Sequence, residues 1–264
     1  MELYTLNEVS KYYERWNIRT REKNINYVIK NLNLTIKDNE FIVVVGKSGI
    51  GKTTLLKMLG GIEKPSAGSI FYTNKELYQC KESEMEGYRR KEIGFIFQDY
   101  RLLDEMTVRE NILVPQILDG ARSTIAERKM KKLTKVLGIS EKKDYYPYEL
   151  SGGEKQRVAI CRALINEPKV ILADEPTAAL DEENRDLLLL IMQEQMKDKG
   201  ILFVSHDVAA LKNLCQNVYV LGAGKIIEHG TMDKLLSSPQ TDWMKQFSAL
   251  SHRESRGEWK WEKL

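Results

Sequence analysis

Residues 46–53 combine glycines, a lysine and a threonine at a spacing that suits the binding of phosphate groups. The segment reads Gly-Lys-Ser-Gly-Ile-Gly-Lys-Thr and fits the pattern G-x-x-x-x-G-K-[ST]. Glycines let the backbone turn tightly, so its N–H groups point at phosphate oxygens, and the positive end of the following helix faces the same anion. Lys52 is expected to reach the β- and γ-phosphates of a nucleotide, and the Thr53 hydroxyl to bind Mg²⁺.

The surroundings of this motif support that interpretation. It follows the apolar segment 41–45, which predicts a buried strand, and it precedes a helix expected over about 52–59. A glycine turn that fits the pattern by chance is expected in on the order of one in a hundred chains of this length. The residues predicted to contact the nucleotide are, from the segment, Gly46, Lys47, Ser48, Gly49, Gly51, Lys52 and Thr53 and, directly after it, Thr54.

Two adjacent acidic residues follow a second apolar segment. Residues 170–173 are Val-Ile-Leu-Ala and predict a buried strand with Asp174 at its carboxyl end, the edge at which parallel α/β sheets bind ligands. We expect Asp174 to support Mg²⁺, directly or through water, and Glu175 to polarise the attacking water as general base. Alone, two acidic residues after a strand are weak evidence for a catalytic site. Together with the phosphate motif, they become strong evidence.

Residues 150–157 predict a second site for an anion. They read Leu-Ser-Gly-Gly-Glu-Lys-Gln-Arg, so Ser151, Gly152 and Gly153 open a helix that is expected to extend to about residue 166. The N-terminus of a helix attracts negative charge. The alternative interpretation is an ordinary helix cap that contains two glycines.

The first half of the chain predicts strands and then a helical region. Residues 1–40 predict β structure, with 14–26 as a polar loop between two strands. A helical region is expected over about 107–137, with Thr107 as its N-cap. Interruptions of this region are expected at Pro115 and Gly120, and further strands at 70–73 and 93–97.

The second half predicts a parallel sheet covered by helices. Strand, helix and strand alternate over 170–173, 182–196 and 201–204, and a hairpin is expected over 218–229. Trp243 and Phe247 are four residues apart, so they should share a helical face that packs on the domain. The end of the chain is expected to be solvated or disordered, and the alternative is an amphipathic contact surface for the partner or the membrane face.

Composition narrows the class of protein. The 264 residues are 42% hydrophobic, which is enough to form a core, and 41 basic residues against 38 acidic residues leave a net charge of only +3, so we expect no nucleic-acid partner. No apolar run approaches the roughly 18–20 residues of a membrane span, and the first residues lack the apolar block of a signal peptide. We therefore expect a cytoplasmic protein, with Cys80, Cys161 and Cys215 as buried free thiols.

Taken in order along the chain, these motifs resemble those of the ATP-binding-cassette (ABC) ATPases. Leu-Ser-Gly-Gly-Glu at 150–154 is similar to that family's signature, which lies between the phosphate loop and the acidic strand. Gln98 fits the Q-loop, residues 179–181 fit the D-loop, and His206 fits the switch histidine. The resemblance extends over nearly the whole chain.

The resemblance implies a fold and its division along the chain. The expected fold is α/β, with a P-loop NTPase core that has a mainly parallel sheet, an N-terminal antiparallel β subdomain and an inserted α-helical subdomain. The core would comprise 1–98 and 151–240, the helical subdomain 99–150, and a C-terminal extension 241–264.

The resemblance also implies that two such domains pair head to tail around two ATP molecules. Ser151, Gly152 and Gly153 of one subunit would contact the γ-phosphate bound to the other subunit, which would be an identical copy, giving a homodimer, or a paralogue. Gln98 and His206 would sense that phosphate, and Gln98 would join Thr53 and Asp174 around Mg²⁺. The catalytic residues would be Glu175, His206 and Lys52.

Tyr13 fits the aromatic residue that stacks on adenine in this family, with Tyr12 and Trp16 as alternatives. A cassette without a membrane domain resembles the ATPase subunit of a transporter, which would sit at the inner face of the cell membrane on a separate permease. Details at 60–68, 94–98 and 172–177 resemble the lipoprotein-releasing, macrolide-export and antimicrobial-peptide-resistance group, which implies export or extraction from the membrane.

Two other functions compete with transport. One is a non-transport ABC ATPase, such as a soluble scaffold subunit of iron–sulfur assembly. The other is a nucleotide-gated binding module with little turnover, and the presence of Glu175 and His206 argues against it.

Overall fold

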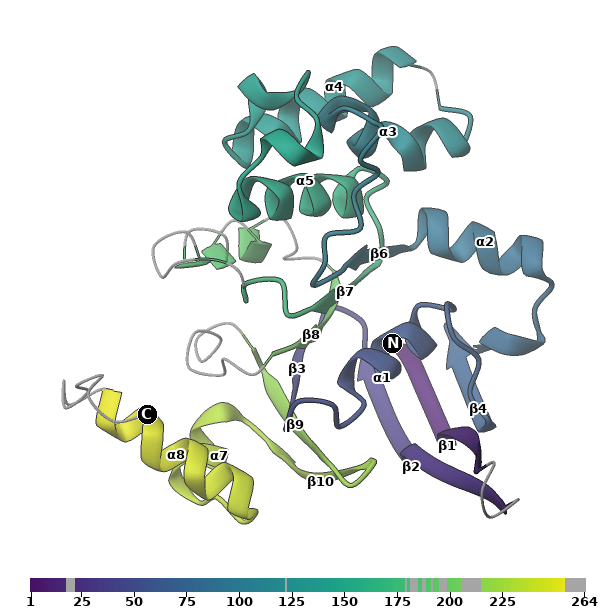
Figure 1. Ribbon diagram of the computed structural model, residues 1–264, viewed down its shortest axis with the longest axis vertical. Coiled ribbons are helices and arrows are strands. Elements are labelled where there is room, and N and C mark those ends of the chain that lie inside the picture. The colour runs from purple at the N-terminus through teal and green to yellow at the C-terminus, as the bar shows by residue number, and fades with distance from the viewer. Residues whose placement is uncertain are drawn as a thin grey trace.

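Two sheets with helices between and around them make up the fold (Figure 1). The computed structural model describes residues 1–17, 22–121, 123–178, 180, 185–186, 189–190, 192–194, 199–205 and 215–254.

The first sheet is antiparallel and has the strand order β2-β1-β4-β5. Its strands are β1 (Glu2–Asn17), β2 (Glu22–Lys37), β4 (Ala67–Tyr72) and β5 (Lys75–Glu76). The predicted β structure of the first 40 residues is confirmed, and the strand predicted at 70–73 begins earlier, at Ala67.

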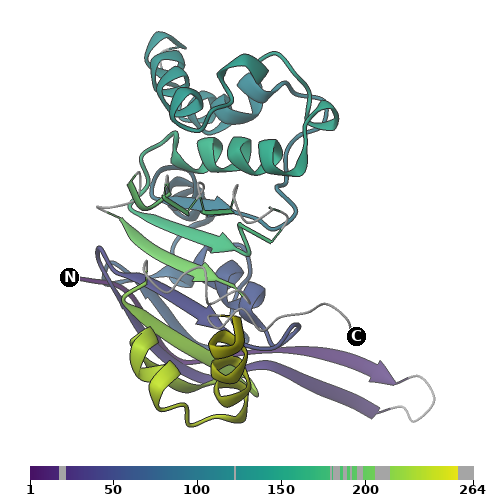
Figure 2. The same ribbon diagram turned by 90° about the vertical axis from the view of Figure 1, so that its left-hand side faces the viewer.

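The loop predicted over 14–26 is wrong, because β1 and β2 continue as paired strands through most of this segment. The rings of Tyr12 and Tyr27 are in contact, with centroids 5.2 Å apart, and Lys23 Nζ lies 2.7 Å from Glu14 Oε1. Such cross-strand pairs stabilise a ladder even where both faces meet solvent. The hairpin therefore projects well beyond the body of the protein (Figure 2).

The second sheet has six strands in the order β10-β9-β3-β8-β7-β6. They are β3 (Phe41–Val45), β6 (Ile93–Ile96), β7 (Val170–Asp174), β8 (Gly200–Val204), β9 (Asn217–Gly222) and β10 (Lys225–Gly230). All neighbours pair in parallel except β9 and β10, which form the predicted hairpin. Every residue of β3, β7 and β8 is buried, as expected for parallel strands with helices on both faces.

The helices confirm most of the predicted positions. They are α1 (Lys52–Leu59), α2 (Glu82–Lys91), α3 (Val108–Leu118), α4 (Ser123–Val136), α5 (Gly152–Leu164), α7 (Met232–Ser237) and α8 (Asp242–Glu254), and short 3₁₀ turns occupy Leu77–Gln79, Ser140–Lys142 and Pro147–Glu149. The sequence did not predict α2, which buries only Met85 and so has little apolar periodicity. The segment 182–196, predicted as a helix, lies mostly outside the described residues.

Thr107 caps α3 as predicted, in a reciprocal capping box with Glu110. The break at Gly120 is confirmed, but α3 continues through Pro115, where an interruption was predicted. Val108 and Ile112 are fully buried in the core that α3 shares with α5, and this packing outweighs the loss of one backbone donor.

The two faces of the six-stranded sheet carry different helices (Figure 1). Leu55, Leu56 and Leu59 of α1 pack with Val44 and other strand residues between the two sheets. On the opposite face, α5 packs against the sheet and is itself covered by α3 and α4. The phosphate motif and the signature segment therefore begin helices on opposite faces of one sheet.

The expected thiol burial is confirmed in part, since Cys161 is buried and Cys80 and Cys215 are half-buried, all three free. Burial raises the pKa of the Cys161 thiol well above its usual range. Among the described helices, none has the length and apolar character that crossing a membrane requires.

A buried carboxylate fixes the C-terminal helices to the sheet. Glu228 on β10 accepts hydrogen bonds from the backbone N–H groups of Gln240 (2.8 Å) and Thr241 (3.0 Å) and from the Thr241 hydroxyl (2.6 Å). Burial favours a higher pKa for Glu228, but these hydrogen bonds outweigh it and lower the pKa overall. As predicted, the stacked rings of Trp243 and Phe247 pack against the core.

Because the pKa of Glu228 is lower in the folded state, its charge contributes stability above the unfolded pKa, about 4.3, and that contribution is lost as the pH falls through the folded value. We expect Glu228→Gln to lower the free energy of unfolding at pH 7 by about 1–2 kcal/mol. Urea unfolding should show this deficit shrinking between pH 7 and pH 3.

The matched control for that measurement is Glu84→Gln, which removes a carboxylate 3.4 Å from the exposed Lys75. An exposed ion pair contributes little, so this change should cost less than about 0.5 kcal/mol. A Glu228→Gln deficit that stays constant with pH would contradict the assignment.

Candidate nucleotide site

Parallel pairing brings the predicted site residues to one edge of the six-stranded sheet. In the register of the strands, Asp174 of β7 lies opposite Val204 of β8, and Val204 lies opposite Val44 of β3. On the other side, Ile96 of β6 pairs with Ala173. The phosphate motif, the loop that carries Gln98 and the pair Asp174–Glu175 therefore all begin where these strands end.

Two glycines of the phosphate motif are required by close approaches of the backbone. A Cβ atom at Gly46 (φ 151°) would lie 2.4 Å from the carbonyl oxygen of Leu221 on β9. A Cβ atom at Gly51 (φ 110°) would lie 2.5 Å from Cγ1 of Val28 on β2. The motif is thus held between the two sheets, and only glycine fits at these two positions.

In the described part of the chain, the N-terminus of α1 lacks the side-chain cap that α3 and α5 have. Thr107 and Ser151 each accept a backbone hydrogen bond at the start of α3 and α5, whereas no side chain does so at Gly51. The first N–H groups of α1 are therefore available to an anion. Lys52, which is buried, donates from Nζ to the carbonyl oxygens of Gly46 (2.8 Å) and Lys47 (3.1 Å) inside the loop.

The electrostatics of Lys52 depend on the two acids. Burial lowers the pKa of Lys52, and the charges of Glu175 and Asp174 act in the opposite direction. Burial likewise raises the pKa of Asp174, whereas a hydrogen bond with the Thr53 side chain and the charge of Lys52 favour the carboxylate. The site thus holds opposite charges close together out of water.

Three residues predicted to surround Mg²⁺ line one cavity of about 410 Å³. They are Thr53, Gln98 and Asp174, and the cavity is also lined by Lys57, Phe97, Asp99 and Arg101. Oδ1 of Asp174 is buried without a hydrogen-bond partner in the described part of the protein. One hydroxyl, one amide oxygen and one carboxylate suit Mg²⁺, which keeps waters and phosphate oxygens as further ligands.

Glu175 has a left-handed backbone conformation (φ 44°), which is unusual for a residue that is not glycine. Its N–H donates to the carbonyl oxygen of Val204 at 2.9 Å, so the turn after β7 is tied to β8. Strained backbone of this kind is typical of sites where a side chain must be aimed.

Tyr13, one of the three candidate aromatic residues, lies beside Thr54, directly after the phosphate motif. Its hydroxyl donates to Glu63 Oε1 at 2.5 Å. Burial and this hydrogen bond raise the pKa of Tyr13, and a hydrogen bond with the Thr54 side chain acts in the opposite direction. Tyr12 instead packs on Tyr27, and Trp16 is 64% exposed on the hairpin.

The signature residues do not line this cavity. Ser151 is the N-cap of α5, and its side chain and that of Glu154 form a reciprocal capping box. Ser151 and Gly152 are exposed and Gly153 is half-exposed, so the surface is open to a ligand. This surface lies on the face of the sheet opposite α1, so the nucleotide predicted at the phosphate motif of the same chain is not expected to reach it.

Some predicted residues lie outside the part of the chain that the structure describes. They are His206 and, in the predicted D-loop, Ala179 and Asp181. The neighbouring Ser205 is described and is buried directly after β8.

The sequence did not reveal several residues that shape the site. Glu63 holds Tyr13, and Arg162 donates to the carbonyl oxygens of Tyr100 and Arg101, just after Gln98. These partners are 50 to 62 residues apart, so no local pattern indicates them.

The chain is similar to proteins that share these motifs. A family described as "ABC transporter" matches residues 29–178. The methionine import ATP-binding protein MetN of Mannheimia succiniciproducens is 38% identical over 221 residues, which are 83% of this chain and 64% of that protein. MetN of Geobacillus kaustophilus is 36% identical over 247 residues, 93% of this chain and 70% of that protein. The chain thus spans about two thirds of the length of these relatives.

Solved structures of one cassette share the fold. The dimeric structure of MJ0796, a bacterial ABC transporter cassette, has a TM-score of 0.80 and 31% identity and covers 87% of this chain and 99% of that one. The dimeric post-hydrolysis state of MJ0796 bound to ADP and Pi has a TM-score of 0.79, 32% identity and the same coverage. The α/β fold predicted from the sequence, with its antiparallel first sheet, is confirmed.

Removal of the Lys52 ammonium tests the site directly. We expect Lys52→Ala to weaken ATP binding roughly 10- to 100-fold, because a charge-assisted hydrogen bond contributes about 1.5–3 kcal/mol. Titration with a fluorescent ATP analogue measures this loss. Lys64→Ala, at an exposed lysine after α1, should bind as the parent does. Equal affinity of Lys52→Ala and the parent would remove the assignment.

Proposed function

The chain belongs to the ABC transporter family of ATPases, and from that premise we propose that it drives a transporter whose membrane-spanning permease is a separate polypeptide. The observation that carries the proposal is the cavity in which Thr53, Gln98 and Asp174 meet beside the phosphate motif. It is the arrangement that hydrolysis of a bound nucleoside triphosphate requires.

Each residue has a separate task in this proposal. Lys52 and the N–H groups at the start of α1 bind the phosphates and orient the γ-phosphoryl group. Glu175 holds and polarises the attacking water, and Tyr13 stacks on the base. Thr53, Gln98 and Asp174 would hold Mg²⁺, which when bound offsets the negative charge of the phosphates. His206 is assigned to the γ-phosphate from the sequence motif alone.

The position of the signature supports the pairing of two subunits. Ser151–Gly153 and the phosphate motif begin helices on opposite faces of the sheet, so one subunit does not bring both to the same nucleotide. In a head-to-tail pair, each nucleotide would lie between the phosphate motif of one subunit and the signature of the other. ATP then holds the pair together, and loss of the γ-phosphate opens it. The solved structures of the MJ0796 cassette are described as dimeric.

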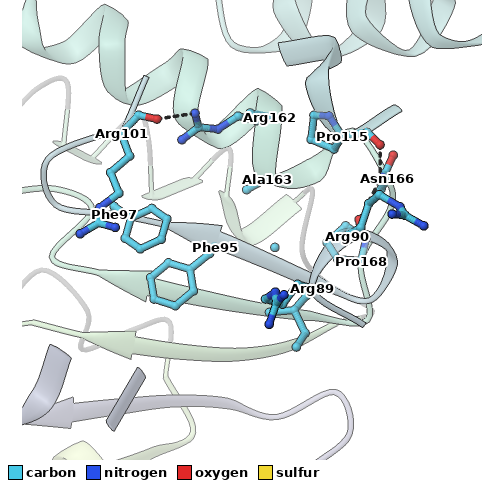
Figure 3. A pocket seen from close by; sticks show the side chains of 12 residues that line it. Arg89, Arg90, Phe95, Phe97, Arg101, Pro115, Arg162, Ala163, Asn166 and Pro168 are labelled. Carbon is cyan, nitrogen blue, oxygen red and sulfur yellow. Dashed lines mark hydrogen bonds between the residues drawn. The ribbon is translucent and has the colours of Figure 1, made fainter. Parts of the chain in front are cut away.

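A cleft between α2, β6 and α5 is the proposed seat of the permease (Figure 3). It has a volume of about 260 Å³, and its floor includes the rings of Phe95 and Phe97, stacked with centroids 4.1 Å apart. Four arginines also line it, namely Arg89, Arg90, Arg101 and Arg162. An apolar floor with positive charges suits an amphipathic segment that carries acidic residues.

Two lines of support differ on the direction of transport. The motifs at 60–68, 94–98 and 172–177 resemble export and extraction ATPases, and the curated relatives are named methionine import proteins. Proteoliposomes that contain the permease and expose the cassettes on the outside separate the two. ATP-driven release of trapped methionine indicates import, and ATP-driven accumulation inside the vesicles indicates export.

Loss of the general base should trap the paired state. We expect Glu175→Gln with ATP and Mg²⁺ to elute from a sizing column at twice the mass of the monomer, because nucleotide binds but is not hydrolysed. Adding Lys52→Ala or Ser151→Arg should return it to the monomer, since each removes one side of the clamp. A variant that stays monomeric even in detergent with the permease present contradicts the pairing.

Docking is tested by co-expression with a candidate multi-span permease. We expect the two to co-purify from membranes. Arg90→Glu, which reverses a charge in the cleft, should reduce the yield of the complex without changing ATP affinity. The control is Arg128→Glu on the exposed side of α4, which should co-purify as the parent does. Recovery of soluble assembly factors alone would favour the iron–sulfur alternative.

A further inference from the structure

The loop that follows Gln98 has an unusual backbone. Tyr100 (φ 59°) and Arg101 (φ 47°) are consecutive residues in the left-handed region, and neither is glycine. Such conformations persist where the surroundings hold them. Within the loop, the N–H of Tyr100 donates to the carbonyl oxygen of Phe97 at 3.1 Å. A second contact therefore has to fix the carbonyl groups of the two strained residues.

Arg162 of α5 provides that contact. Its Nη1 donates to the carbonyl oxygen of Arg101 and its Nη2 to that of Tyr100, both at 2.6 Å (the first is drawn in Figure 3). Burial lowers the pKa of Arg162, and within the described residues no carboxylate pairs with it. Both terminal nitrogens of the guanidinium thus donate to the loop backbone. A lysine ammonium cannot reproduce the planar geometry of these two hydrogen bonds.

The loop forms a wall between two cavities. Phe97 and Arg101 line both the cleft of Figure 3 and the cavity that holds Thr53, Gln98 and Asp174. The guanidinium of Arg101 lies over the ring of Phe97, 4.5 Å from its centroid, and Phe97 is stacked on Phe95. A shift of this loop would therefore move Gln98 relative to Asp174.

We propose that Arg162 is a positioning residue, which holds the loop 98–101 so that the Gln98 side chain reaches the Mg²⁺ site. The inference rests on the proposed function. Arg162 does not touch the nucleotide in this scheme. Its effect passes through the backbone of Tyr100 and Arg101 to Gln98.

The proposal is tested by the factor by which Mg²⁺ increases affinity for a fluorescent ATP analogue. Arg162→Lys keeps the charge and the aliphatic stem but loses the two-pronged grip. We expect it to reduce this factor about fivefold, with unchanged affinity in the presence of EDTA, because the phosphate motif is intact. Gln98→Ala should give a similar loss, and the double variant should lose no more than either single variant.

The control is Arg128→Lys on α4, which should leave the factor unchanged. The inference would be overturned if the losses in the double variant were additive. It would also be overturned if Mg²⁺ increased the affinity of Arg162→Lys by the same factor as that of the parent. In either case, normal hydrolysis by the parent would leave the proposed function standing. If the parent itself binds no ATP with Mg²⁺, the proposed function fails. If Arg162→Lys does not fold, Gln98→Ala decides alone, and a parental factor in that variant overturns the inference.

Discussion

Parallel hydrogen bonding between β3, β8, β7 and β6 is the constraint on which the rest of the structure depends. Parallel strands end at the same edge, so three loops that are far apart in sequence meet there. Those loops carry Lys52 and Thr53, Gln98, and Asp174 with Glu175. Every residue of β3, β7 and β8 is buried, which forces the polar chemistry of these strands to their ends. The buried Oδ1 of Asp174, which has no hydrogen-bond partner among the described residues, is a result of that arrangement.

The same sheet separates two anion-binding helix termini. Because α1 and α5 cover opposite faces, the free N–H groups of α1 and the exposed Ser151 serve different places. An arrangement of this kind is of little use to one chain alone. It becomes useful when a second subunit supplies what each half-site lacks, and the proposed role of ATP in assembly follows from this geometry.

The sequence predicted the site motifs and most strands because those signals are local. Apolar runs such as 170–173, glycines at required turns and a capping box at Thr107 depend on neighbours within a few residues. The errors have physical causes. The hairpin through Glu14 and Lys23 is exposed on both faces and is stabilised by cross-strand pairs that periodicity does not show. The contacts of Glu63 with Tyr13, and of Arg162 with the Gln98 loop, join distant parts of the chain.

The close fit of Gly46 against Leu221 and of Gly51 against Val28 has a consequence for how the protein communicates. A phosphate cradle that is wedged between two sheets before any ligand arrives gains its affinity from rigidity. Such a loop has no second conformation that would distinguish one bound ligand from another. A difference between two and three bound phosphates must therefore be transmitted by neighbouring segments that have room to rearrange.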